Sequence, residues 1–334
     1  MLELAASNLV SPIILSFALG LFAALARSDL SIPEAAAKGM SIYLLFSIGF
    51  KGGVAVADNG IDGQLLATLA AGFVLSAVIP FLAFALLRVL TRLDTLNAAA
   101  VAGHYGSISI VTFVAGSSVL ESAGLTAEGY MVATAAIMEA PAILSALWLA
   151  TRAADVGDGG DGGDGSGGSR MDAALLREIL LNGSIVLLVG AFFIGLATGN
   201  DGLDLIASFI VAPFQGVLCL FLLDMGLIAG RGLRETRGVL GAGTVLFGII
   251  MPLIGAALGL ASGMMLGLST GGLVLLMTLS ASASYIAVPA AMRVALPEAK
   301  PAIYLTLSLG ITFPFNLVLG IPLYLAVASL VTGA

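Results

Sequence analysis

The sequence predicts an all-α polytopic membrane protein with ten transmembrane helices, arranged as two inverted five-helix repeats. Of its 334 residues, 59% are hydrophobic and only 10% are charged, and the mean hydropathy is +1.11. Soluble domains are about 25% charged, so a water-soluble fold is excluded. Because a spanning helix needs about 20 apolar residues, such a chain must cross the bilayer many times. The net charge of −7 argues against nucleic acid as a partner.

Ten apolar runs, separated by charged residues, glycine or proline, are the expected spans. Between the fifth and sixth runs, the Gly/Asp-rich segment 152–178 cannot bury a core and is expected to be a flexible linker. The chain therefore divides into a first repeat at 1–151, this linker, and a second repeat at 179–334. The expected spans are 9–26, 39–57, 64–90, 96–120, 129–151, 179–198, 205–230, 238–262, 270–292 and 301–331.

The basic residues indicate the orientation of these spans. Twelve of the 13 Lys and Arg residues fall in or beside loops that follow an odd-numbered span, whereas the opposite loops contain acidic residues and no Lys or Arg. Basic residues near span ends favour the cytoplasm, so the linker is expected there and both termini outside. The thirteenth, Lys51, lies within the second span, and its long side chain could snorkel towards a span end.

The two halves of the chain show hints of internal repetition. Five spans are an odd number, so a second copy must enter the membrane upside down, as in many secondary transporters. The matching segments share a spacing of about half the chain: 44–53 with 221–230, 78–82 with 250–254, and 106–110 with 281–285.

Small and hydroxyl-bearing residues interrupt the fourth span at 102–112 and the ninth at 278–284. Small residues let a helix unwind and let a ligand approach the backbone. An unwound helix offers N–H groups to a small anion on one side of the break, and carbonyl and hydroxyl oxygens to a cation such as sodium on the other. The alternative is that these residues only allow close helix packing.

Ionisable residues within the spans are further candidates. Glu139 lies in the fifth span beside Pro141, and a buried carboxylate is costly unless it is paired, protonated or bound to a cation. Its counterpart in the tenth span is the neutral Asn316, and Asp224 is open to a structural or a functional role. His104 has no second metal-ligating residue at suitable spacing, so a catalytic metal site is not expected.

Enzyme motifs are nearly absent from the sequence. It contains no Walker motif and no HExxH, and its GxSxG match at 267–271 falls in an external loop between two spans rather than at a strand-to-helix turn. The chain is therefore not expected to be an enzyme.

Several segments, spread over nearly the whole chain outside the linker, carry a family resemblance. They are Ile48-Gly49-Phe50-Lys51-Gly52-Gly53, His104-Tyr105-Gly106-Ser107-Ile108-Ser109, Thr112-Phe113, Met138-Glu139-Ala140-Pro141, Ser282-Ala283-Ser284-Tyr285-Ile286-Ala287, Pro289-Ala290-Ala291-Met292-Arg293, Pro297-Glu298-Ala299 and Thr312-Phe313-Pro314-Phe315-Asn316. In these segments the chain resembles the sodium-dependent bicarbonate transporters first associated with cyanobacterial carbon concentration.

The resemblance implies a gate domain of spans 1, 2, 6 and 7 and a core domain of spans 3–5 and 8–10, with the broken fourth and ninth spans crossing. It implies a sodium-coupled symporter that imports bicarbonate or a similar small anion across the bacterial inner membrane by an elevator-type alternating-access mechanism. Sodium is the coupling ion, and no other cofactor is expected. The implied partners besides membrane lipid are two further copies in a homotrimer and a PII-like cytoplasmic regulator.

The resemblance also assigns site residues by position. The residues expected to line the anion site are Ser107, Ser109, Thr112, Ser282 and Ser284. The residues expected to bind sodium are Gly106, Ser107, Glu139, Ser284 and Asn316. Two other functions stay open: a sodium-coupled carrier of a larger organic anion, of the bile-acid or monocarboxylate type, and a membrane sensor or scaffold in which these serines only pack.

Overall fold

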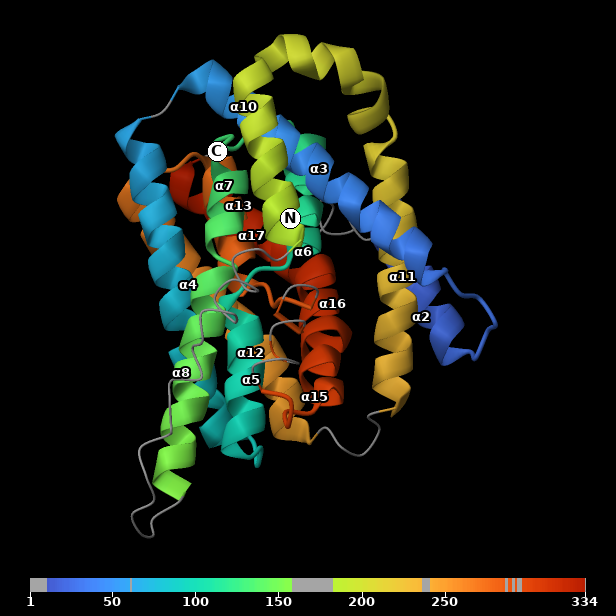
Figure 1. The fold of residues 1–334 in the computed structure, drawn as a ribbon, viewed down its shortest axis with the longest axis vertical. Coiled ribbons are helices and arrows are strands. Elements are labelled where there is room, and N and C mark those ends of the chain that lie inside the picture. The colour runs from blue at the N-terminus through green and yellow to red at the C-terminus, as the bar shows by residue number, and fades with distance from the viewer. Residues whose placement is uncertain are drawn as a thin grey trace.

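The computed structural model describes residues 11–60, 62–157, 183–235, 241–285, 288–289, 292 and 296–333. Every regular element within these ranges is a helix (Figure 1). The elements are α2 (Pro12–Leu25), α3 (Glu34–Asn59), α4 (Gly63–Leu90), α5 (Thr95–Gly106), α6 (Ile110–Ser122), α7 (Met131–Ile137), α8 (Ala140–Gly157), α10 (Gly183–Ile210), α11 (Phe214–Glu235), α12 (Ala242–Leu266), α13 (Thr270–Ala281), α15 (Pro301–Leu305), the π-helices η1 (Thr306–Thr312) and η2 (Asn316–Gly320) on either side of α16 (Phe313–Phe315), and α17 (Ile321–Thr332).

The length and the surface of these helices suit a lipid bilayer. In the described part of the chain, eight helical segments are long and apolar enough to cross a membrane, and α2 and α13 are shorter apolar helices. Large apolar side chains point outward, such as Phe22 at 68%, Val89 at 81% and Met265 at 89% exposure. A helix satisfies its own backbone hydrogen bonds, which is what a segment in hydrocarbon requires. The prediction of an all-helical membrane fold is confirmed at this level.

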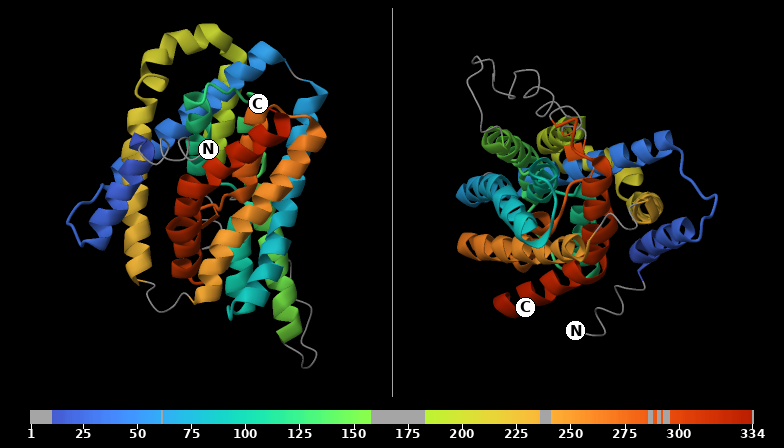
Figure 2. Two further views of the ribbon diagram at one scale, coloured as in Figure 1. Left: turned by 180° about the vertical axis from the view of Figure 1, so that it is seen from behind. Right: turned by 90° about the horizontal axis from the view of Figure 1, so that it is seen from below.

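Two helix pairs pack through glycine. Helix α3 packs along α10, and α2 lies beside α11 at one edge of the molecule (Figure 2). Small residues let helix backbones approach closely in membranes. An added Cβ would collide with a carbonyl oxygen of the facing helix at each of four glycines: Gly53 with Phe192, Gly195 with Phe50, Gly20 with Leu223, and Gly226 with Phe17. These four helices correspond to spans 1, 2, 6 and 7, and their assignment as a separate gate domain stays a prediction.

Prolines within the spans free carbonyl groups that other elements then use. A helical proline removes one hydrogen bond and its ring clashes with the carbonyl four residues earlier. In α12, Pro252 leaves the carbonyl of Gly248 without its helical hydrogen-bond donor. This carbonyl instead accepts a hydrogen bond from the Thr312 hydroxyl at 2.7 Å. In α4, Pro80 likewise leaves the carbonyl of Ser76 without its helical donor, and Gly106 of α5 packs against this carbonyl.

The fifth and tenth spans are not regular α-helices throughout. The fifth is interrupted at Met138 and Glu139, between the end of α7 and the start of α8. In a continuous helix the ring of Pro141 would clash with the carbonyl of Ile137, and α7 ends at that residue. The tenth contains the wider turns of the π-helices η1 and η2. η1 includes the residue four positions before Pro314, and η2 includes the residue four positions before Pro322. The prolines in these two spans account for the irregular turns.

The expected start of the seventh span is wrong. Residues 205–210 belong to α10, which bends at Gly199 where φ is +58°, and α11 begins only at Phe214. Pro213 disfavours helical conformation in the residue before it, so the new helix begins after it. The segment after Gly199 is fixed to α3 by a 2.6 Å hydrogen bond from the Tyr43 hydroxyl to the carbonyl of Phe209.

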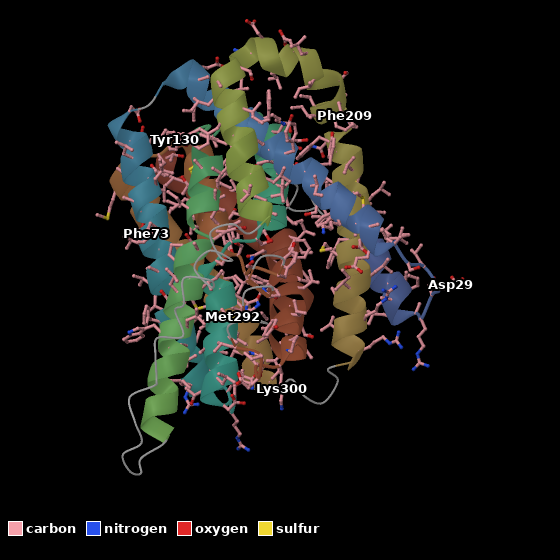
Figure 3. The ribbon with its side chains drawn as sticks, in the orientation of Figure 1. Asp29, Phe73, Tyr130, Phe209, Met292 and Lys300 are labelled. Atoms are coloured by element: carbon pink, nitrogen blue, oxygen red, sulfur yellow. The ribbon has the colours of Figure 1, made fainter. Side chains whose placement is uncertain are left out.

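α5 starts at the end of the bundle where Figure 3 labels Lys300, opposite the end where Phe209 lies, and this start is capped. Asp94 caps α5 by accepting hydrogen bonds from the Asn97 backbone at 2.8 Å and its side-chain amide at 2.6 Å. Partial burial acts to raise the pKa of Asp94, but these hydrogen bonds outweigh it and hold the pKa below its usual value. The Asn97 amide oxygen accepts from the Lys300 backbone at 2.8 Å, which joins the starts of α5 and α15.

Candidate functional site

The first part of the candidate site is the break in the fourth span. Helix α5 ends at Gly106 and α6 begins at Ile110, with Ser107 and Ser109 in extended conformation between them. Ser109 caps α6: its Oγ accepts from the Thr112 backbone N–H at 3.2 Å and from the Thr112 hydroxyl at 2.9 Å. The capping serine and the small residues before it explain why the helix stops and restarts here.

The second part is the break in the ninth span. Helix α13 ends at Ala281, and Ser282 is extended. The Ser282 hydroxyl donates to the carbonyl of Leu279 at 2.8 Å, and the Asn316 amide donates to the carbonyl of Ala281 at 2.8 Å. Two of the orphan carbonyls at the end of α13 are thereby satisfied.

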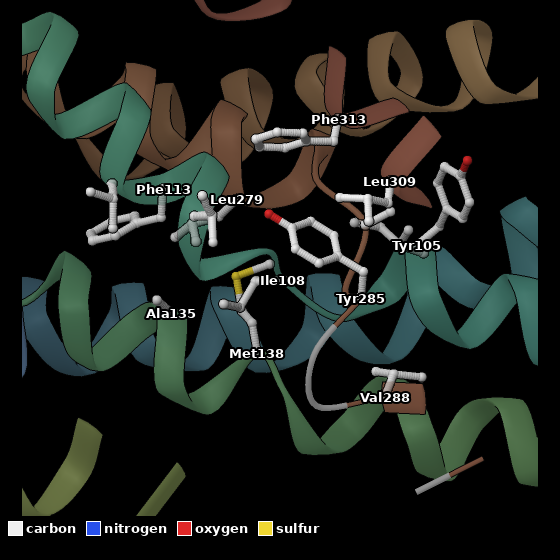
Figure 4. Packing of buried hydrophobic residues seen from close by; sticks show 14 of the residues in the cluster. Tyr105, Ile108, Phe113, Ala135, Met138, Leu279, Tyr285, Val288, Leu309 and Phe313 are labelled. Atoms are coloured by element: carbon white, nitrogen blue, oxygen red, sulfur yellow. The ribbon is translucent and has the colours of Figure 1, made fainter. Parts of the chain in front are cut away.

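The structure brings the two breaks into direct contact. The Ser109 backbone N–H donates to the Ser282 hydroxyl at 2.9 Å, and the Ser284 backbone N–H donates to the carbonyl of His104 at 2.7 Å. Figure 4 shows Ile108 of the first break close to the ring of Tyr285 in the second. We name this contact of residues 106–112 with 281–285 the crossing. Two short stretches of non-helical backbone therefore hold each other in the buried centre of the fold.

Several buried polar atoms at or near the crossing have no hydrogen-bond partner among the described residues. Two of them are the Ser107 Oγ and the Ser280 Oγ. An unsatisfied buried polar group costs about 1–3 kcal/mol, and such groups in a native protein call for an explanation such as a ligand. The first N–H groups of α6 also have no acceptor within their own helix and form its positive end. The crossing therefore offers donors suited to a small anion.

Glu139 lies in the third break, between α7 and α8. The carbonyl of its neighbour Met138 accepts from the Ser76 hydroxyl at 2.6 Å, and Ser76 also lines Gly106 at the crossing. In Figure 4 the Met138 side chain lies beside Ile108. The Glu139 side chain is only 4% exposed, and its Oε2 has no described hydrogen-bond partner. A buried oxygen of this kind is suited to a cation.

The residues predicted for the site fall into two sets. Ser109, Thr112 and Ser282 are joined by hydrogen bonds, and the backbone of Ser284 is tied to the same place. Ser107 and Gly106 lie in the same break, whereas no described hydrogen bond joins the Glu139 carboxylate to these serines. Asn316 contacts the end of α13, and its side-chain oxygen accepts from the Tyr324 hydroxyl at 2.8 Å. Its role in binding sodium stays a prediction.

Sequence reasoning missed two tyrosines near the crossing. The Tyr105 hydroxyl lies 2.6 Å from the Thr312 hydroxyl, which in turn binds the carbonyl freed by Pro252. Tyr285 packs edge to face on Phe313, with ring centroids 5.5 Å apart. Both tyrosines are next to residues that the sequence marked as site candidates, Gly106 and Ser284. They were missed because an aromatic residue in an apolar span is usually interpreted as part of the hydrophobic core.

Other candidates from the sequence have structural partners. Ser269, in the GxSxG match, caps α13, and its N–H and hydroxyl both bind the Glu128 carboxylate, at 2.7 and 3.1 Å. The His104 ring pairs through Nδ1 with the carbonyl of Ala100 at 2.7 Å and stacks on Tyr304. In the part of the chain that the structure describes, no three His, Cys, Asp or Glu residues gather as for a metal centre.

A buried crossing of discontinuous helices in an apolar helical bundle is the kind of site that secondary transporters use. The family model of the Na+-dependent bicarbonate transporter superfamily matches residues 12–329, so the chain belongs to that superfamily and is a multi-pass membrane protein. Comparison with curated protein sequences finds no match. The family expected from the sequence motifs is thereby confirmed.

Proposed function

We propose that the protein is a sodium-coupled symporter that imports bicarbonate and binds it at the crossing. The observation that carries this proposal is the pair of broken helices joined by Ser109 and Ser282, beside a Ser107 hydroxyl that has no described partner. The N–H groups at the start of α6 and the Ser107 hydroxyl can donate to a planar oxyanion. Membership of the superfamily favours bicarbonate over the larger organic anions left open by the sequence.

Sodium is the second substrate in this proposal. It prefers hard oxygen ligands, which the neighbourhood provides as the Ser107 hydroxyl and the Glu139 carboxylate. Binding both ions together lowers the electrostatic cost of burying either, because each neutralises the other. This mutual neutralisation is the physical basis for coupling the two fluxes.

Alternating access is proposed to follow an elevator motion in a homotrimer. The glycine-packed pairs α2 with α11 and α3 with α10 would form the fixed gate, and the helices that carry the crossing would form the moving core. A PII-like regulator would bind the cytoplasmic face. Residues 152–157 of the predicted linker belong to α8, and the rest of the linker lies outside the described residues.

Uptake of labelled bicarbonate into proteoliposomes tests the function. An inward sodium gradient should drive accumulation, and an equal potassium gradient should not, because potassium does not fit the coupling role proposed for sodium. A labelled bile acid serves as the control substrate. Absence of sodium-dependent uptake of bicarbonate would contradict the proposal, and uptake of the bile acid in its place would favour the larger-anion carrier.

The orientation is a separate proposal. Lys300 lies at the end of the bundle opposite Tyr130 and Phe209 in Figure 3, which supports a cytoplasmic face at the Lys300 end. In a Cys219→Ala background, cysteines at Ser166 and Ala334, both outside the described residues, are labelled in intact cells with an impermeant thiol reagent. We expect modification at position 334 and protection at 166. The reverse pattern would overturn the orientation.

A further inference from the structure

A cavity with one basic residue in its lining lies apart from the serines of the crossing. It has a volume of about 270 Å³ and is bounded by α3, α6, the loop before α7, and the start of α11. Its lining includes Lys51 on α3, Phe113 and Ser117 on α6, and the carboxylate-bearing residues Glu121 and Glu128. Lys51 is the one basic residue that the sequence places within a span rather than near a loop.

We propose that this cavity is an outer binding site for a small oxyanion, held by the Lys51 ammonium before it reaches the crossing. The identity of the anion as bicarbonate rests on the proposed function. The existence of an anion site at Lys51 does not, because it depends on the charge and shape of the cavity alone.

The charge of Lys51 is the first argument. Its Nζ lies 5.0 Å from the ring centroid of Phe214, a cation–π contact that holds the ammonium against the cavity wall. No ion pair joins Lys51 to a residue in the described ranges. A half-buried cation that has no described ion pair attracts a mobile anion.

The two acidic residues of the cavity are placed so that they do not neutralise Lys51. The Glu128 carboxylate is taken up by the N–H and hydroxyl of Ser269 at the start of α13, whose positive helix end favours that charge. Glu121 is exposed in the last turn of α6. Lys51 is the single cationic residue among those that line the cavity.

The size and direction of the cavity are the second argument. Pockets for drug-sized ligands are about 300–1,000 Å³, so 270 Å³ suits a small hydrated anion better than a large organic one. Its lining includes Phe113, the residue directly after Thr112 of the crossing, and Leu275 on α13. Phe113 therefore links the cavity lining to the crossing through α6, since its backbone N–H donates to the carbonyl of the capping Ser109.

Charged thiol reagents test this site without any transport assay. In the full-length, detergent-solubilised Cys219→Ala protein, Ser117→Cys introduces a thiol in the cavity wall. Its reaction rates with an anionic and a cationic methanethiosulfonate of similar size give a rate ratio. Because a focused field raises the local concentration of counter-ions about tenfold or more, Lys51→Met should lower the anionic-to-cationic ratio by about tenfold. Lys51→Arg keeps the charge and should retain the ratio.

Bicarbonate as a competing ligand provides the second arm. It should slow the anionic reaction at Ser117→Cys when Lys51 is present and have no effect in Lys51→Met. Ser122→Cys, on the exposed end of the same helix and outside the cavity lining, is the matched control and should show neither effect.

The outcomes separate this inference from the proposed function. A rate ratio unchanged by Lys51→Met, or a bicarbonate effect absent in both backgrounds, would overturn the outer anion site even if sodium-dependent uptake is intact. Conversely, a Lys51-dependent ratio with bicarbonate protection, in a protein that shows no sodium-dependent uptake, would retain the site and reject the symport function.

Discussion

Replacing Glu139 with glutamine should raise the sodium concentration for half-maximal bicarbonate transport by about tenfold. The amide keeps the volume of the side chain and loses its charge, and a charge-assisted interaction is worth about 1.5–3 kcal/mol. A loss of about 1.4 kcal/mol corresponds to a factor of ten in affinity. Because Oε2 has no described hydrogen-bond partner, the substitution breaks no described bond of that oxygen, and the melting temperature should not fall.

The control for this variant is Glu34→Gln, which removes a carboxylate from the exposed start of α3. It should leave the sodium dependence unchanged. If Glu139→Gln lowers the melting temperature and leaves the sodium dependence as in the parent protein, the carboxylate is structural and its sodium role is lost. Transport rates in proteoliposomes at graded sodium concentrations, with thermal unfolding of the purified protein, provide both readouts.

Ser109→Leu should abolish bicarbonate binding. The leucine side chain would occupy the volume between the two breaks and remove the cap of α6, where the Ser109 Oγ accepts two hydrogen bonds from Thr112. Loss of a cap costs about 1 kcal/mol of stability. Ser11, which caps α2 far along the chain, is the matched control: Ser11→Leu should lose a comparable cap energy and keep full affinity.

Alanine at Ser107 distinguishes a binding serine from a packing serine in the same series. The Ser107 Oγ has no described partner, so its removal should leave the melting temperature unchanged. If the hydroxyl donates to the anion, affinity should fall by roughly fivefold to tenfold, for a loss of about 1 kcal/mol or somewhat more. Unaltered affinity in Ser107→Ala, Ser109→Ala, Ser282→Ala and Ser284→Ala, measured by direct binding, would show that the site has been put in the wrong place.

Much of the fold and part of the site could be predicted from the sequence, because those features are local. Each apolar run of about 20 residues predicted one membrane-spanning helix. The serine and glycine clusters marked where helices end, and α5 and α13 do end within them, at Gly106 and Ala281. A capping serine three residues before a hydroxyl-bearing residue, as in Ser109 and Thr112, is likewise a pattern of neighbours along one chain.

Only the tertiary structure decided which of these local features meet. The hydrogen bond from Ser109 to Ser282 joins residues 173 positions apart. The hydropathy of one segment does not indicate which distant segment it will contact. The same is true of the Thr312 hydroxyl that satisfies the carbonyl freed by Pro252, and of the contact between Lys51 and Phe214 that places a cation in a cavity. Composition determined that the chain is a membrane bundle, and the serine and glycine clusters marked the breaks in its helices. The packing of one half against the other decided where the breaks cross, because buried backbone groups left unpaired by each break must find their partners in another element.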